Sequence, residues 1–345
     1  MYSQKKNTAV PTAQWFFLFA LLISCNFTAQ TLRDTLSNSQ TIKNQLYLQC
    51  DPHYVYEYSK PKFWDVVTYV PQDVYRFGVY TVQKEHLKWD ALALGSTLAI
   101  IPFDQKLMEE ADHLGHQLGG WDQDNQYNKL FGLLNIIPKN ISSGVYYIGN
   151  GGTTLLLSGL FYTIGSGKTK DYRALNTSSE LIECLLSVGV VTQSIKRITG
   201  RQSPKPAIAD GNEGGNWNPF PSFEAFQTNT PNYDAMPSGH LATFMATITV
   251  IATNYPEKRW IKPVGYSLMT ILSFNMVSSK VHWVSDYPIG LFIGYVMGKQ
   301  IAERRIKKIP KNAEGMLPPF RKKYEFNINS RSFGNTSLLG CSITF

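Results

Sequence analysis

The segment Pro237-Ser238-Gly239-His240 stands directly before an apolar run that is typical of a helix. A helix N-terminus presents unpaired backbone N–H groups and the positive end of the helix dipole, so it suits an anion such as a phosphate group. Ser238 can cap the helix or donate to a phosphate oxygen, Gly239 keeps the backbone open to the anion, and His240 can donate or accept a proton. The alternative is an ordinary N-cap serine followed by a surface histidine.

Two further polar segments stand at the ends of apolar stretches elsewhere in the chain. The first, KRITGRQSP, carries Lys196 and Arg201. The second, KVHWVSDYP, carries His282 and Asp286, four residues apart. These residues also have structural alternatives. Lys196 and Arg201 could be a basic helix end that complements the dipole, His282 a half-buried histidine, and Asp286 the cap of the next helix. Together, three segments at helix ends can converge on one side of a bundle.

Six apolar stretches could position these segments. None shows the sustained alternation of a half-buried strand, so we predict an all-α fold built as a six-helix bundle. The stretches cover residues 90–103, 145–164, 180–198, 239–255, 263–280 and 287–304. An N-terminal extension is predicted to add two short helices, and the C-terminal tail a short β-hairpin. The Gly/Asn/Pro-rich loop 205–236 is expected to cover the site.

The first thirty residues have the pattern of an export signal, with a basic start, the apolar stretch WFFLFALLISC and a small-residue cleavage site after Ala29. A lipoprotein with Cys25 as its lipidated first residue and an uncleaved anchor are the alternatives. We predict an exported chain, periplasmic or associated with the envelope membrane. Its predicted parts are a signal peptide (1–29), an N-terminal extension (30–87), the bundle (88–306) and a tail with the hairpin (307–345).

The composition of the chain limits the kinds of partner that it can bind. A net charge of +8 and a pI near 9.1 suit phosphate groups or an anionic membrane surface. The basic residues are scattered apart from AERRIKKIPK, and no nucleic-acid motif is present, so we expect no nucleic acid as a partner. Cys50, Cys184 and Cys341 have neither disulfide-framework nor zinc-site spacing, and Cys184 is expected to be a small core residue.

Charge placement also bears on whether the helices cross a membrane. If a cleaved signal leaves the N-terminus outside, six crossings would put the basic linkers GSGKTKDYR and PEKRWIK outside as well, against the positive-inside tendency. An exported bundle that does not span the bilayer removes this conflict, and we favour it.

The ordered set of segments resembles the type 2 phosphatidic acid phosphatase and vanadium haloperoxidase superfamily, in its phosphatase branch. That family's pattern is Lys, six residues, Arg-Pro; then Pro-Ser-Gly-His; then Ser-Arg, five residues, His, three residues, Asp. Lys196 and Pro204 fit the first element, residues 237–240 match the second in full, and the third is fitted by His282 and Asp286. The resemblance covers roughly residues 88–305.

The resemblance implies a phosphohistidine route that needs no metal or other cofactor. His282 would attack phosphorus, Asp286 would hold its other ring nitrogen, and His240 would protonate the leaving group. Charge on the phosphate oxygens would be stabilised by Lys196, Ser238 and the Gly239 N–H.

Two departures from the family pattern weaken the expected phosphate clamp. The first-element arginine falls on Ser203 and the third-element arginine on Met276, and neither side chain can replace a bidentate cation. We expect Arg201 to reach into the site in compensation, with Lys280 as a weaker candidate.

The resemblance implies an exported phosphatase acting on phosphomonoesters or diphosphates, of lipids in particular, at a membrane surface. One alternative is a catalytically silent phosphate- or lipid-binding or envelope-structural protein on the same fold. Another is a vanadate-dependent haloperoxidase, which the two missing arginines disfavour. A metal site at Asp112, His113 and His116 is a weak further possibility, because no ligand cluster accompanies these residues.

Overall fold

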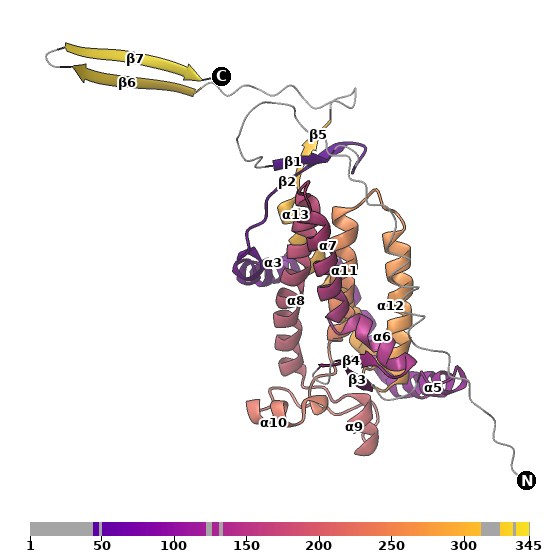
Figure 1. Cartoon of the computed structure of the whole chain (residues 1–345). Coiled ribbons are helices and arrows are strands. Elements are labelled where there is room, and N and C mark those ends of the chain that lie inside the picture. The colour runs from indigo at the N-terminus through magenta and orange to yellow at the C-terminus, as the bar shows by residue number, and fades with distance from the viewer. Residues whose placement is uncertain are drawn as a thin grey trace, which may run out of the picture.

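The computed structural model describes residues 44–47, 50–121, 126–130, 134–311, 325–333 and 336–344. The predicted signal peptide, its cleavage site after Ala29 and the alternative lipidation site Cys25 lie outside these residues. The described part is mostly helical, as predicted (Figure 1).

Long helices form the body of the molecule. They are α4 (Leu87–Ile100), α7 (Gly152–Gly165), α8 (Tyr172–Thr199), α11 (Gly239–Asn254), α12 (Ile261–Ser278) and α13 (Tyr287–Arg305). Shorter helices flank them: α2 (Asp65–Thr68), α3 (Val70–Val82), α5 (Asp104–Gln117), α6 (Ile141–Gly149), α9 (Pro204–Ala209) and α10 (Phe223–Thr228). Three 3₁₀ turns, η1 (Ile101–Phe103), η2 (Thr230–Asn232) and η3 (Val284–Asp286), complete the helical elements of the described residues.

The helix boundaries differ from the predicted ones at three places. The stretch 145–164 is two helices, because Gly151 adopts a left-handed conformation (φ 84°) and breaks α6 from α7. Helix α8 begins eight residues before the predicted start at 180, where the Asp171 side chain accepts from the Ala174 N–H and caps it. The segment after Phe103, which lies outside the six predicted stretches, contains α5.

Short strands were not predicted in the N-terminal extension. Strand β2 (Tyr54–Ser59) pairs antiparallel with both β1 (Asn44–Tyr47) and β5 (Lys307–Pro310). This small sheet ties the extension to the end of α13. Strands β3 (Tyr127–Leu130) and β4 (Leu134–Pro138) form a second antiparallel pair. The predicted C-terminal hairpin is present as β6 (Glu325–Phe333) and β7 (Thr336–Thr344). The division of the chain into domains stays a prediction.

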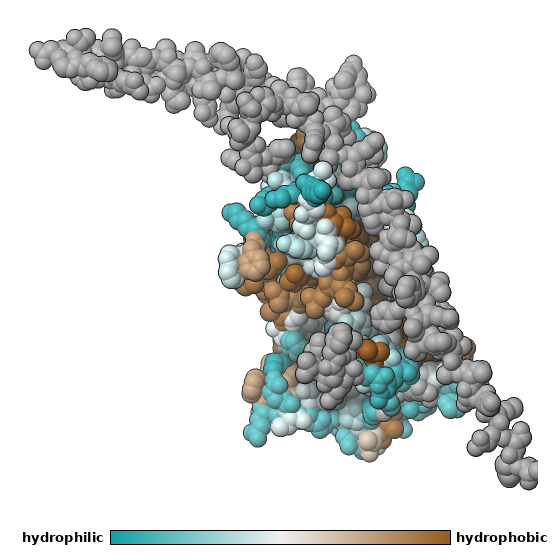
Figure 2. All heavy atoms as spheres, in the orientation of Figure 1, coloured by the Kyte–Doolittle hydropathy of each residue, from teal (hydrophilic) through white to brown (hydrophobic). Residues whose placement is uncertain are grey.

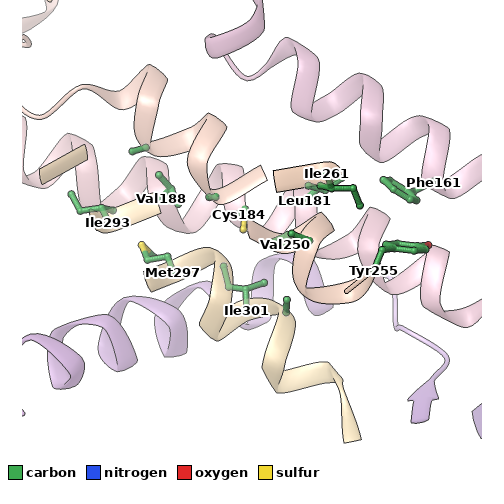
Figure 3. Close-up of a cluster of buried hydrophobic side chains, with 14 of the residues drawn as sticks. Phe161, Leu181, Cys184, Val188, Val250, Tyr255, Ile261, Ile293, Met297 and Ile301 are labelled. Carbon is green, nitrogen blue, oxygen red and sulfur yellow. The ribbon is translucent and has the colours of Figure 1, made fainter. Parts of the chain in front are cut away.

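The main apolar core lies where α8, α11 and α13 meet (Figure 3). Leu181, Val250, Met297 and Ile301 are buried in it. Cys184 is buried among them as a small core residue, as expected. A second cluster joins α11, α12 and the start of α13, and there Met276 and Trp283 are fully buried. The two clusters hold α11 from both sides and so fix the position of its N-terminus.

A stripe of glycines lets α13 approach α11 closely. A Cβ added to Gly290 would lie 2.7 Å from the Ser238 carbonyl oxygen, and one added to Gly294 would lie 2.2 Å from the Ala242 carbonyl oxygen. Both distances are too short for a side chain, so the four-residue glycine spacing is required for the contact. The contact sets the start of α13 against the start of α11.

One face of the bundle carries an apolar patch between hydrophilic ends (Figure 2). Exposed residues of α7 and α12, among them Leu155, Leu156 and Val264, are large and apolar. Among the described residues, α8 is the one helix both long and apolar enough to cross a membrane, and 61% of its apolar window is buried inside the protein. A single buried helix of this kind is weak evidence for a span.

Candidate active site

Three helix ends meet at the end of the bundle opposite the β1–β2–β5 sheet (Figure 1). They are the C-terminus of α8, the N-terminus of α11, and η3 with the start of α13. Gly200 ends α8 in the left-handed conformation (φ 55°), and a Cβ there would lie 1.7 Å from the Asn218 carbonyl oxygen. The Ser238 N–H donates to the Asp286 carbonyl oxygen at 3.0 Å and joins α11 to η3.

A line of three side chains crosses this junction. His240 Nδ1 lies 3.3 Å from His282 Nε2, and His282 Nδ1 lies 3.4 Å from Asp286 Oδ2. His282 is buried at 2% exposure and Asp286 is fully buried. Asp286 also accepts from the Trp283 N–H at 2.9 Å. The predicted trio therefore comes together, with one imidazole held by a carboxylate on Nδ1 and directed at a second imidazole through Nε2.

His240 occupies the first turn of α11. Its ring lies against Tyr146 with the ring centroids 4.6 Å apart. Burial, the neighbouring His282 and the Lys196 cation all lower the pKa of His240 well below its usual value. The imidazole is therefore neutral in the free protein at neutral pH, and an arriving anion would favour its protonation.

The Pro-Ser-Gly-His segment combines a structural and a binding feature. The Ser238 hydroxyl accepts from the Leu241 N–H at 3.5 Å and is fully buried, so this serine is the N-cap of α11. A Cβ at Gly239 would lie 3.9 Å from Lys196 Cε and Nζ, so the lysine passes over the glycine backbone. Within the described residues, the N–H groups of Gly239 and His240 make no hydrogen bond and are free for an anion.

Lys196 has an unpredicted partner. Its Nζ lies 3.4 Å from Asp234 Oδ2, and the Ser203 hydroxyl lies 3.4 Å from the other carboxylate oxygen. Asp234 is about a quarter exposed whereas Lys196 is buried. Ser203, the residue at the position of the family's first arginine, thus contacts a carboxylate. Sequence reasoning missed it because a lone Asp in a polar loop carries no positional signal.

The expectation for Arg201 is wrong. Its guanidinium is fully buried and donates to Asp286 Oδ1 at 2.8 Å and to Asp104 Oδ2 at 2.6 Å, behind the carboxylate that holds His282. It therefore points away from the open nitrogen of the histidine pair. Asp104, the first residue of α5, was not predicted either.

The other positions weighed for the clamp also lie outside the phosphate region. Met276 is a fully buried core residue whose carbonyl accepts from the His282 N–H at 3.1 Å. Lys280, the weaker candidate for the clamp, pairs with Asp112 at 2.9 Å, so its ammonium group is held by a carboxylate. Among the described residues, no group of three or more His, Cys, Asp or Glu side chains could hold a metal ion.

The helical bundle thus brings two histidines, a carboxylate and a lysine to one set of helix ends. Residues 179–307 match the family model of the PAP2 superfamily, which is consistent with the resemblance to the type 2 phosphatidic acid phosphatase superfamily. The matched region contains all three helix ends. The family supports phosphatase-type activity in general. Comparisons with curated proteins and with solved structures found no match.

Proposed function

We propose that this protein is an exported phosphatase that hydrolyses phosphomonoesters or diphosphates of lipids through a phosphohistidine intermediate. The observation that carries the proposal is the line from His240 through His282 to Asp286, with contacts of 3.3 and 3.4 Å. A carboxylate on Nδ1 fixes the tautomer that leaves Nε2 as the nucleophile. The second histidine lies where the leaving oxygen would depart.

The chemistry then needs two displacements at phosphorus. His282 Nε2 forms a bond to phosphorus while the bond to the leaving oxygen breaks, and protonated His240 gives that oxygen its proton. Water next attacks the phosphohistidine, neutral His240 accepts a proton from it, and phosphate departs from His282. Throughout, Lys196 and the free N–H groups at the start of α11 stabilise the phosphoryl oxygens.

An apolar groove supports a lipid substrate. It runs along α7, α11 and α12 with a cavity volume of about 230 Å³, and its lining includes Ile148, Phe244, Ile251 and Val264. Phe244 lies one helical turn beyond His240. A hydrocarbon chain in this groove would thus leave its phosphate near the histidines. The apolar patch of Figure 2 would face the membrane surface from which the lipid comes.

A catalytically silent binding or envelope-structural protein is the second candidate. It is favoured by the loss of both family arginines, at Ser203 and Met276, and by the carboxylate of Asp234 beside the sole lysine of the clamp. The same features disfavour vanadate retention and hence a haloperoxidase.

The test is phosphate release by the purified mature chain against its His282→Ala variant. An aryl phosphate, a lipid phosphate and a polyprenyl diphosphate serve as substrates. Release that disappears in the variant supports the proposed function. Equal signals from both proteins on all three substrates favour the silent protein.

Export is tested separately by sequencing the N-terminus of the protein recovered from the cell envelope. A mature chain that starts at Gln30 supports the cleaved signal. A lipidated Cys25 or an intact N-terminus supports one of the two alternatives.

A further inference from the structure

Arg201 lies between two buried carboxylates directly behind the histidine line. One terminal nitrogen donates to Asp286 and to the Ser285 hydroxyl at 2.8 and 2.6 Å, and the other donates to Asp104 at 2.6 Å. All four side chains are fully buried. The guanidinium also lies against the rings of Trp217 and Trp283, at 4.8 and 5.4 Å from their centroids.

Asp104 fixes this arrangement from a separate helix. Its Oδ1 accepts from the Ser285 N–H at 3.0 Å, and its Oδ2 accepts from both Arg201 and the Ser285 hydroxyl. Asp104 therefore holds the η3 turn through its backbone and holds the guanidinium through its charge. The turn in question is the one that carries Asp286.

The two oxygens of Asp286 have separate tasks. Oδ1 accepts from Arg201, while Oδ2 accepts from the Trp283 N–H and faces His282 Nδ1. With Oδ1 fixed by a planar guanidinium that is itself packed between rings, the carboxylate cannot rotate. Its negative charge also has a permanent counter-charge in the Arg201 guanidinium.

We infer that Arg201 and Asp104 are positioning residues for the nucleophile: acting through Asp286, they hold His282 with Nδ1 protonated and Nε2 free. This inference rests on the proposed function, in which Nε2 attacks phosphorus. The arginine next to the phosphate site thus serves the nucleophile and not the phosphate.

Three ionisable groups surround His282 or its partner His240. Asp286 faces His282 from η3 and His240 faces it from α11, while Lys196 of α8 lies beside His240. Arg201→Met removes the countercharge of Asp286, and Asp104→Asn keeps the shape of the cluster with one charge fewer. We expect kcat/KM to fall about 100-fold in Arg201→Met and about 10-fold in Asp104→Asn, in line with small displacements of a reacting group.

A double-mutant cycle separates positioning from general destabilisation. If Arg201 acts through Asp286, adding Arg201→Met to Asp286→Asn should cost less than about threefold further activity. The matched control is Arg173→Met, which also removes a buried arginine stacked on an aromatic ring and paired with a glutamate, Glu257, at 2.7 Å. The control should lower the melting temperature and leave the histidines unchanged.

The tautomer of His282 gives a readout that does not need activity. In chain labelled with ¹⁵N-histidine, assigned with the His282→Ala variant, the neutral ring of His282 in the wild type should carry its proton on Nδ1. Arg201→Met and Asp104→Asn should show a mixture of the two tautomers.

The outcomes distinguish the inference from the proposed function. An unchanged His282 spectrum in folded Arg201→Met and Asp104→Asn, or fully additive losses in the cycle, would overturn the positioning role. If the wild type releases no phosphate while the two variants still show the change of His282 tautomer, the proposed function is overturned and the positioning role is retained.

Discussion

Replacing Asp234 by Asn should tighten the binding of phosphate-like anions. The carboxylate lies 3.4 Å from Lys196 Nζ, so a phosphate oxygen in contact with that lysine would lie about 5 Å from the negative charge. Coulomb repulsion at this distance is about 3 kcal/mol at an effective dielectric constant near 20. Because Asp234 is about a quarter exposed, screening reduces this to about 1–2 kcal/mol, or roughly a 5- to 30-fold lower Ki.

The measurement is competitive inhibition of aryl phosphate hydrolysis by orthovanadate and by phosphate, at low and high salt. The gain in Asp234→Asn should shrink as salt rises, because it comes from a partly exposed charge. Glu257→Gln is the control. Glu257 has nearly the same exposure as Asp234 and pairs with Arg173 at 2.7 Å, and its substitution removes an equal charge at the other end of α8. An unchanged Ki would refute the repulsion, and a raised Ki would mean that Asp234 serves mainly to orient Lys196.

Three further predictions follow from particular groups. Because the pKa of His240 lies well below its usual value in the free protein, the protonated acid and hence kcat/KM should rise as pH falls through the neutral range. His240→Asn should lose this dependence and lower kcat/KM for alkyl phosphates about 10²-fold or more, while sparing kcat/KM for nitrophenyl phosphate, which reports the first displacement and whose leaving group needs no proton. Equal losses of kcat/KM on both substrates would contradict a general acid. Burial raises the pKa of Glu180 from 4.5 to about 7, so its cost to folding is absent below pH 4.5 and grows to about 3 kcal/mol above pH 7; Glu180→Gln should therefore raise the melting temperature at pH 8 and leave it nearly unchanged at pH 4.5, and a gain independent of pH would count against this cause. Gly200→Ala should lower the unfolding free energy by more than about 1 kcal/mol and abolish phosphate release, because its Cβ would meet the Asn218 carbonyl oxygen and displace the start of the Arg201 segment; a thermal melt with a near-wild-type midpoint would show that the α8 terminus adapts.

The sequence predicted those parts of the site that stand next to a change from polar to apolar residues. His240 and Asp286 lie at helix starts and Lys196 at a helix end, so the helix pattern alone placed them at element ends that can converge. The helical bundle was likewise predictable, because the apolar stretches that form it are local features of the sequence. The break between α6 and α7 was missed because Asn150-Gly151 interrupts a stretch that stays apolar on both sides.

The rest depended on contacts between residues far apart in the chain. Asp104 and Arg201 are 97 positions apart, and strands β2 and β5 pair across some 250 residues, as in the contact between Glu57 and Lys307. Neither pairing leaves a local periodicity. The predicted role of Arg201 was wrong for a related reason. Its position in the sequence is close to Lys196, but the chain turns at Gly200 in the left-handed conformation and the Arg201 side chain is fully buried.

The charges of the site are largely balanced, so most of the substrate affinity should come from the hydrocarbon chain and not from the phosphate group. Lys196 is offset by Asp234, Arg201 is held between two carboxylates, and His240 is neutral in the free protein. A phosphate group alone thus meets little net positive charge beyond the α11 N-terminus, whose contribution is typically below about 1 kcal/mol at an exposed site. Burying one methylene of a hydrocarbon chain contributes about 0.8 kcal/mol, so a few carbons in the groove along α7, α11 and α12 would exceed it. Affinity should therefore rise steeply with chain length in a series of alkyl phosphates. A flat series would place the hydrocarbon outside the groove and leave Lys196 and the helix terminus as the main determinants of binding.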